Sequence, residues 1–132
     1  MSASTTPKVP QPGTPRLILG SRGSPLAMRQ THEVRDRLIA AWPELGAAGA
    51  IGIEEIKTTG DAVRDRPLAD IGGKGLFIKE IEQALVAGRI DAAVHSMKDM
   101  ETTMADGTAL VAVLPREDPR DAWLSPVCLL YT

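Results

Sequence analysis

Short apolar runs alternate with amphipathic stretches from Arg16 onward, and this alternation narrows the choice of fold more than any other feature of the sequence. The apolar runs predict buried strands at residues 17–19, 51–58, 92–94 and 109–114, with a further candidate at 121–125. Two helices are expected between these strands. Strands that alternate with helices predict an α/β domain with a mixed, largely parallel sheet flanked by helices. The side chains expected on the inner helix faces are Thr31, Val34, Leu38 and Trp42 in the first helix, and Ile78, Ile81, Leu85 and Val86 in the second.

The boundaries of both helices are marked by residues that start or stop helices. Ser24 can cap the first turn, and Pro25 at the first helical position loses an N–H that has no partner there. Pro43 is expected to end the first helix, together with the glycine at position 46. Gly88 is expected to close the second.

The residues before the first helix form a candidate anion site. Ser21, Arg22 and Gly23 lead directly into the helix that Ser24 caps, so free backbone N–H groups, the positive end of the helix and a guanidinium can point the same way. A carboxylate or a phosphate fits such a place. The alternative is that Ser24 is only a cap and Arg22 a solvated surface residue. The segment lacks the G-x-G-x-x-G spacing of a dinucleotide loop, which argues against a nicotinamide or flavin cofactor.

Three polar segments are predicted to meet at one edge of the sheet. Ligands of α/β folds bind where the carboxyl ends of strands meet helix starts, and residues 20–27, 72–77 and 95–99 all lie at such points. The middle segment, GGKGLF, fails as a P-loop because Gly75 follows Lys74 where that motif needs Ser or Thr. It is either a glycine-rich hinge that presents Lys74 and Phe77 to a cleft or a plain turn.

The last of these segments, HSMKD, places Lys98 and Asp99 just beyond the third predicted strand. Adjacent opposite charges are ordinary on a protein surface. Beside a cleft, the lysine could hold an anionic arm of a substrate while the aspartate serves as an acid, a base or a stabiliser of a cation. His95 could join them or simply form a hydrogen bond at the strand end. His32, isolated within the first helix, is assigned to structure.

Composition argues against several other classes of protein. A net charge of -2 offers no bulk attraction to nucleic acid or to an anionic membrane. The single cysteine, Cys128, cannot form an internal disulfide and has no neighbours at metal-ligand spacing, so no metal is expected and a reducing cytosol is favoured. No apolar run approaches the roughly 18 residues that span a bilayer. The Pro-rich residues 1–15 predict a disordered tail.

Five strings of residues resemble those of a known family: LGSRGSPLA, KTTGD, GGKGLFIKEIEQAL, DAAVHSMKDM and REDPRDAWLS. In this order and at these separations they are similar to hydroxymethylbilane synthase, also called porphobilinogen deaminase. The resemblance implies a fold like that of periplasmic binding proteins, with two α/β domains around a cleft and a third domain that bears a covalently attached dipyrromethane primer. It also implies the activity: porphobilinogen is deaminated, four units are coupled to the primer, and hydroxymethylbilane is released for porphyrin and haem biosynthesis.

The resemblance assigns roles to individual residues. Asp99 stands at the aspartate of the family's HS-x-KD string and would be the catalytic carboxylate, which stabilises the azafulvene cation left when porphobilinogen loses ammonia. Arg22, Ser24 and Lys98 match positions that hold the acetate and propionate arms of primer or substrate. The remaining candidates are Lys74 and Phe77 in the family's flexible loop, and Gln30 and Ser96 as secondary contacts.

The resemblance also sets expectations for the ends of the domain. Met100 and Glu101 stand where the family has a small apolar residue and proline, and Ala105 where a proline is common; these departures change the loop more than the chemistry. Family members run to more than twice this length, so residues 16–126 are expected to be an incomplete first domain and 127–132 a tail unlike the family. The cysteine that carries the primer is expected to be absent from this chain, since Cys128 lies far too early.

Two functions from different classes therefore remain open. The first is the enzyme, represented by its first part: a cytosolic monomer acting on porphobilinogen, with no nucleic acid or membrane partner. The second is a non-catalytic anion-binding module or an inactive remnant with the same fold. A nucleotide-binding domain is a third reading, which depends on GGKG alone.

Overall fold

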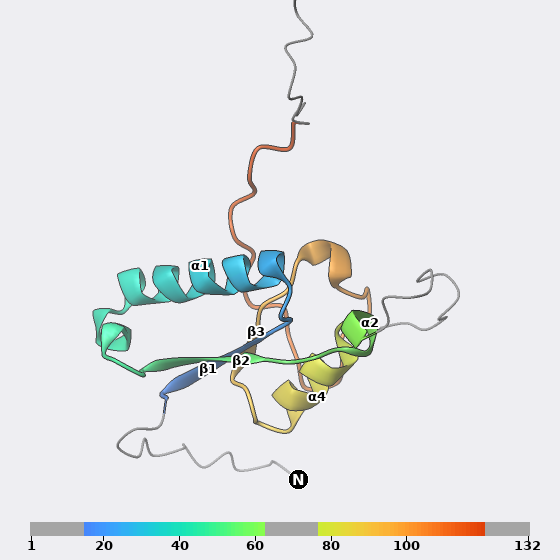
Figure 1. The fold of residues 1–132 in the computed structure, drawn as a ribbon, viewed down its shortest axis with the longest axis horizontal. Helices are drawn as coiled ribbons and strands as arrows, with labels where there is room; N and C mark the ends of the chain where they lie inside the picture. The colour runs from blue at the N-terminus through green and yellow to red at the C-terminus, as the bar shows by residue number, and fades with distance from the viewer. Residues whose placement is uncertain (1–14, 63–76, 121–132) are drawn as a thin grey trace, which may run out of the picture.

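The computed structural model describes residues 15–62 and 77–120 (Figure 1). Three strands, three helices and two short 3₁₀ turns lie within these ranges. No helix there is long and apolar enough to cross a membrane. In chain order the elements are β1 (Leu17–Ser21), α1 (Pro25–Ala41), η1 (Pro43–Gly46), β2 (Ile51–Glu55), α2 (Thr59–Ala62), α4 (Lys79–Val86), β3 (Ala92–Ala93) and η2 (Met97–Asp99).

The strands form one parallel sheet in the order β2-β1-β3. Leu19 of the central strand is in register with Ile53 on one side and Ala92 on the other. Helix α1 covers one side of the strands and α4 lies on the other (Figure 1). The predicted α/β fold is confirmed. Because all three strands run the same way, their carboxyl ends meet at one edge of the sheet.

Helix α1 begins as its sequence predicts. The Ser24 hydroxyl accepts a hydrogen bond from the backbone N–H of Ala27 at 3.3 Å, and Pro25 occupies the first turn. The inner face carries the buried Thr31, whose hydroxyl donates to the Ala27 carbonyl. Trp42 lies beyond the helix end and is exposed, so its predicted place on the inner face is wrong. Trp42 is the C-cap residue, and its non-helical backbone does not continue the inner face of the helix.

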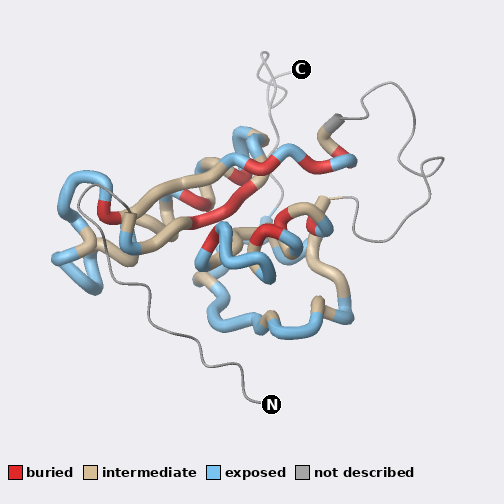
Figure 2. Tube along the Cα trace, turned by 90° about the horizontal axis from the view of Figure 1, so that it is seen from below, coloured by how far each residue is buried: buried red, intermediate tan, exposed pale blue. Residues whose placement is uncertain are grey.

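The core lies between the strands and α4, and Figure 2 shows buried positions along the strands and on the inner side of that helix. Ile81 and Ala84 of α4 pack with Ile56 and Ile90 in one apolar cluster. Gly88 ends the helix with a φ of 68°, a conformation that side chains rarely adopt. Val86 is 63% exposed, so its predicted place on the inner face is wrong. Val86 directly follows the inward-facing Leu85, and the turn of the helix carries its side chain away from the inner face.

The second half of the chain contains the clearest error of the sequence-based prediction. Residues 109–114 were expected to form a strand, yet they pair with no strand in the described part of the chain, and Val111 is 88% exposed. A continuous apolar run such as ALVAVL favours an extended backbone but does not provide a neighbouring strand to pair with. The predicted strand at 51–58 ends at Glu55 and is followed by the short helix α2, which was not anticipated. The predicted tail and the candidate strand at 121–125 lie outside the described residues, apart from position 15.

Close packing at Gly20 gives a prediction for stability. A Cβ at this buried position of β1 would lie 2.3 Å from Cδ1 and 3.2 Å from Cγ2 of the buried Ile90. Gly20→Ala is therefore expected to lower the free energy of unfolding by about 1–3 kcal/mol through overpacking, measured by urea denaturation. Gly46→Ala is the matched control, because its Cβ would meet only Cγ2 of Ile39, at 3.3 Å. Equal losses in both variants would contradict the packing argument.

Candidate functional site

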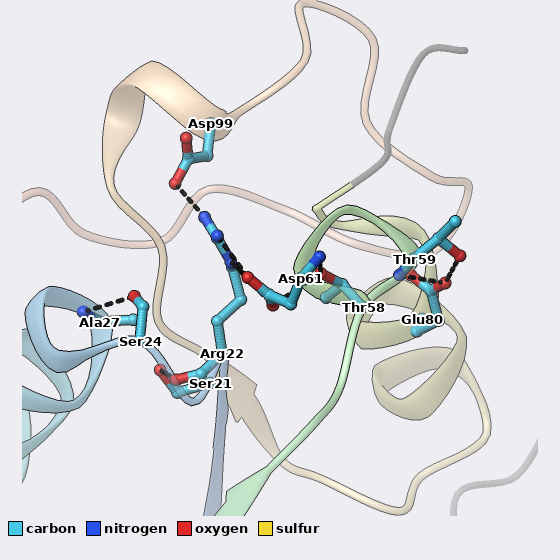
Figure 3. A network of polar contacts seen from close by, with 9 residues as sticks. All are labelled: Ser21, Arg22, Ser24, Ala27, Thr58, Thr59, Asp61, Glu80 and Asp99. Atoms are coloured by element: carbon cyan, nitrogen blue, oxygen red, sulfur yellow. Dashed lines mark hydrogen bonds and ion pairs between the residues drawn. The ribbon is translucent and has the colours of Figure 1, made fainter. Parts of the chain in front are cut away.

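Side chains from three segments meet at the carboxyl edge of the sheet (Figure 3). Arg22 follows β1 directly, Asp61 lies in α2 just after β2, and Asp99 lies in η2 after β3. The described residues of two predicted segments, 20–27 and 95–99, do come together. The third is represented by Phe77 alone, because Lys74 lies outside the described residues.

The guanidinium of Arg22 bridges two carboxylates. Its Nη2 lies 2.6 Å from Oδ1 of Asp61, and its Nε lies 3.2 Å from both oxygens of the same carboxylate. On the other side, Nη1 donates to Oδ2 of Asp99 at 3.0 Å. The exposed fractions of these side chains are 16% for Arg22, 27% for Asp61 and 17% for Asp99. Arg22 is thus a partly buried, paired residue, and the alternative of a solvated surface arginine is wrong.

Charge and hydrogen bonding in this cluster favour the ionised forms of Arg22 and Asp61. The hydrogen bond from Arg22 is the main cause that lowers the pKa of Asp61, and the Thr58 hydroxyl, which donates to Oδ2 at 2.7 Å, adds to it. The hydrogen bond to Asp61 in turn raises the pKa of Arg22. Burial lowers the pKa of nearby His95, which favours a neutral imidazole.

Phe77 covers one face of the guanidinium. The Cζ atom of Arg22 lies 4.1 Å from the centre of the Phe77 ring, a distance at which a cation and an aromatic face attract each other. The ring rests against Gly60, where a Cβ would lie only 2.3 Å from a ring atom. Glycine at position 60 therefore leaves the space in which Phe77 reaches Arg22.

The other predicted binding residues surround this cluster. The Ser96 hydroxyl donates to Oε1 of Gln30 at 2.8 Å, which ties the segment after β3 to α1. The Ser24 hydroxyl is engaged as the helix cap. Lys98 is exposed in η2, next to Asp99 in sequence. The roles assigned to these side chains remain predictions.

Asp61 and Thr58 were missed as site residues by the sequence-based reasoning. Their string, KTTGD, was noted as part of the family resemblance, but it was given no role at the sheet edge. The signal was available, because this string runs over the carboxyl end of the strand predicted at 51–58, and parallel strands bring their carboxyl ends to the same edge.

The cluster at the sheet edge thus joins one guanidinium to two carboxylates from different segments. A family model for "Porphobilinogen deaminase, dipyromethane cofactor binding domain" matches residues 17–130. The chain belongs to the porphobilinogen deaminase family. The matched family model is that of the domain that binds the dipyrromethane cofactor.

Relatives in plants and bacteria are similar along most of this chain. A protein of Oryza sativa subsp. japonica named porphobilinogen deaminase, chloroplastic, is 62% identical over 106 residues, which cover 80% of this chain and 30% of the relative. Porphobilinogen deaminase of Nitrobacter winogradskyi is 60% identical over 108 residues, 82% of this chain and 34% of the relative. Porphobilinogen deaminase of Paracoccus denitrificans is 57% identical over 118 residues, which cover 89% of this chain and 37% of the relative. The chain thus spans about a third of the length of the curated relatives it matches.

The sheet edge carries groups of the kind that binds the carboxylates of a dipyrromethane. The side chains of Arg22 and Lys98 are cationic, and Ser96 and Gln30, which bond to each other, are polar. Among the described residues, no group of three or more His, Cys, Asp or Glu side chains is arranged to hold a metal ion.

Proposed function

We propose that this chain supplies the catalytic aspartate and one anion-binding wall of a hydroxymethylbilane synthase. In this reaction porphobilinogen loses ammonia, and four such units are joined on a dipyrromethane primer to give linear hydroxymethylbilane. The observation that carries the proposal is the contact at 3.0 Å between the Asp99 carboxylate and the Arg22 guanidinium at the carboxyl edge of the sheet. This contact places the negative charge of Asp99, proposed to stabilise a cation, beside the positive charge of Arg22, proposed to bind a carboxylate.

Asp99 has the chemical task in this proposal. The aminomethyl nitrogen of porphobilinogen leaves as ammonia once it is protonated, and the C–N bond breaks with its electron pair going to nitrogen. The remaining azafulvene is electron-poor and positively charged, so a carboxylate beside it lowers the energy of the step. Asp99 is partly buried, which makes its charge more effective than in bulk water.

The neighbouring side chains are proposed to hold the substrate and the primer. Arg22 and Lys98 would bind acetate and propionate arms, with Ser24, Ser96 and Gln30 as polar neighbours. Phe77 would limit the access of water to the guanidinium that it covers. When bound, the dipyrromethane supplies the pyrrole carbon to which the first unit is joined. We further propose a cytosolic protein, on the basis of its single cysteine, and a monomer, as the family resemblance implies.

A chimera tests this function directly. Residues of this chain would replace the matching segment of the Nitrobacter winogradskyi porphobilinogen deaminase, and the formation of hydroxymethylbilane from porphobilinogen would be measured. The chimera is expected to be active, because the segments that build the edge of the sheet are transferred intact. A chimera that folds but forms no product, while the unmodified relative does, would instead favour a non-catalytic anion-binding module.

A further inference from the structure

We propose that Asp61 is a positioning residue that presets Arg22, and that Thr58 fixes Asp61 for this purpose. Asp61 occupies the Nε edge of the guanidinium, Thr58 holds Asp61 in place, and the Nη1 end of Arg22 remains directed at Asp99. This inference rests on the proposed function for its consequence in turnover, but its structural content can be tested without any activity.

The hydrogen bonds of Arg22 are divided unequally between the two carboxylates. Asp61 receives both the Nε–H and an Nη2–H, whereas Asp99 receives only an Nη1–H. A guanidinium binds a carboxylate best through two parallel N–H groups. Asp61 already occupies such a pair of donors, so Arg22 reaches Asp99 through a single contact.

Thr58 is a rigid support for Asp61. It is buried, and its hydroxyl donates to Oδ2 of Asp61 at 2.7 Å while accepting from the Asp61 backbone N–H at 3.3 Å. The carboxylate is therefore held by the Thr58 hydroxyl as well as by Arg22. Phe77 covers one face of the same guanidinium.

The arrangement matters because a freed Arg22 would turn its two-donor edge toward Asp99. A two-donor contact with Arg22 would engage the Asp99 carboxylate in a stronger ion pair and weaken its ability to stabilise a substrate cation. Asp61 is thus inferred to limit the contact between Arg22 and Asp99 to the single Nη1–H, which keeps the rest of the Asp99 carboxylate available. Neither Asp61 nor Thr58 needs to touch the substrate for this effect.

Nuclear magnetic resonance of the isotope-labelled chain tests directly whether Asp61 occupies the Nε edge of Arg22. The exchange of the Arg22 Nε–H with water reports whether that edge is occupied, and Arg22→Lys identifies its signal by removing it. In Asp61→Asn, exchange of this proton is expected to become about tenfold faster or more, the equivalent of a lost charge-assisted hydrogen bond. Thr58→Val should give a smaller increase in the same direction. Backbone amide spectra show whether each variant is folded.

An exposed ion pair of the same chain is the matched control. Arg37 donates its Nε–H to Glu33 at 2.9 Å on the surface of α1. Glu33→Gln should change the exchange of the Arg37 Nε–H only and leave that of Arg22 as in the wild type. If Arg22 in the folded Asp61→Asn and Thr58→Val variants exchanges as slowly as in the wild type, Asp61 does not hold the edge and the proposal is wrong.

Turnover of the chimera tests the consequence separately. Asp61→Asn is expected to lower kcat about tenfold in the presence of Arg22 and less than about twofold in an Arg22→Lys background, where the two-donor edge is already gone. Equal losses in both backgrounds would show that Asp61 acts independently of Arg22. An inactive chimera would count against the proposed function, while the exchange measurement would still decide the positioning of Arg22.

Discussion

Asp99→Asn is expected to reduce the kcat of the chimera by about 10³-fold or more, because a neutral amide cannot stabilise the cation formed when ammonia leaves. The amide has nearly the shape of the carboxylate and can still accept a hydrogen bond from Arg22 through its oxygen. The free energy of unfolding should therefore change little compared with turnover. The measurement is hydroxymethylbilane formation at saturating porphobilinogen, with thermal unfolding followed in parallel.

Asp106→Asn is the control for the loss of a negative charge close to Asp99 in the sequence. Asp106 is exposed, seven positions after Asp99 and outside the Arg22 cluster described above. Its variant should keep turnover close to that of the unmodified chimera. Near-normal activity of Asp99→Asn would remove Asp99 from the catalytic role, whatever its position in the structure.

Arg22→Met is expected to lower the free energy of unfolding by about 1–3 kcal/mol at neutral pH, because it leaves two partly buried carboxylates without their shared cation. Methionine retains much of the apolar stem, so the loss reports mainly on the guanidinium. Urea denaturation of the chain gives the value. Arg35→Met, which removes an exposed pair with Asp36, should change stability by less than about 0.5 kcal/mol.

The same variant should change how stability depends on pH. Arg22 lowers the pKa of Asp61, so at mildly acid pH the folded chain binds fewer protons than the unfolded chain. The stability from this pair is fully present above the ordinary pKa of an aspartate, 3.8, and is lost as the pH falls through the lowered pKa. The gap between wild type and Arg22→Met should thus be smallest in strong acid and widen toward neutral pH. A gap that stays constant with pH would contradict the pairing.

The first half of the fold could be predicted from sequence because its signals are local. The run before Gly20, the cap at Ser24 and the stop at Pro43 each act within a few residues, and the elements they predict are present. Residues 109–114 show the limit of such reasoning. Whether an apolar extended segment becomes a strand depends on a neighbour elsewhere in the chain, and its own sequence does not contain that information.

The candidate site was predictable to the extent that parallel topology made it so. Once strands and helices alternate, the segments after β1 and β3 must share an edge, and Arg22 and Asp99 do meet there. The pairing with Asp61 was not predicted, because it depends on the short helix α2, which has only four residues and no periodicity to reveal it. The family resemblance pointed to the string KTTGD but not to the contact that it makes.

The spacing of the three charged partners along the chain has a consequence for the order in which the protein is built on the ribosome. Asp61 lies 39 residues after Arg22, and Asp99 lies 77 residues after it. Contacts between nearby parts of a chain close with the smaller loss of entropy, and synthesis delivers Asp61 first. Arg22 can therefore pair with Asp61 once β1, α1, β2 and α2 have emerged and before β3 and η2 are made. When Asp99 arrives, it meets a cation that is already committed elsewhere, so an over-strong pairing has no opportunity to form.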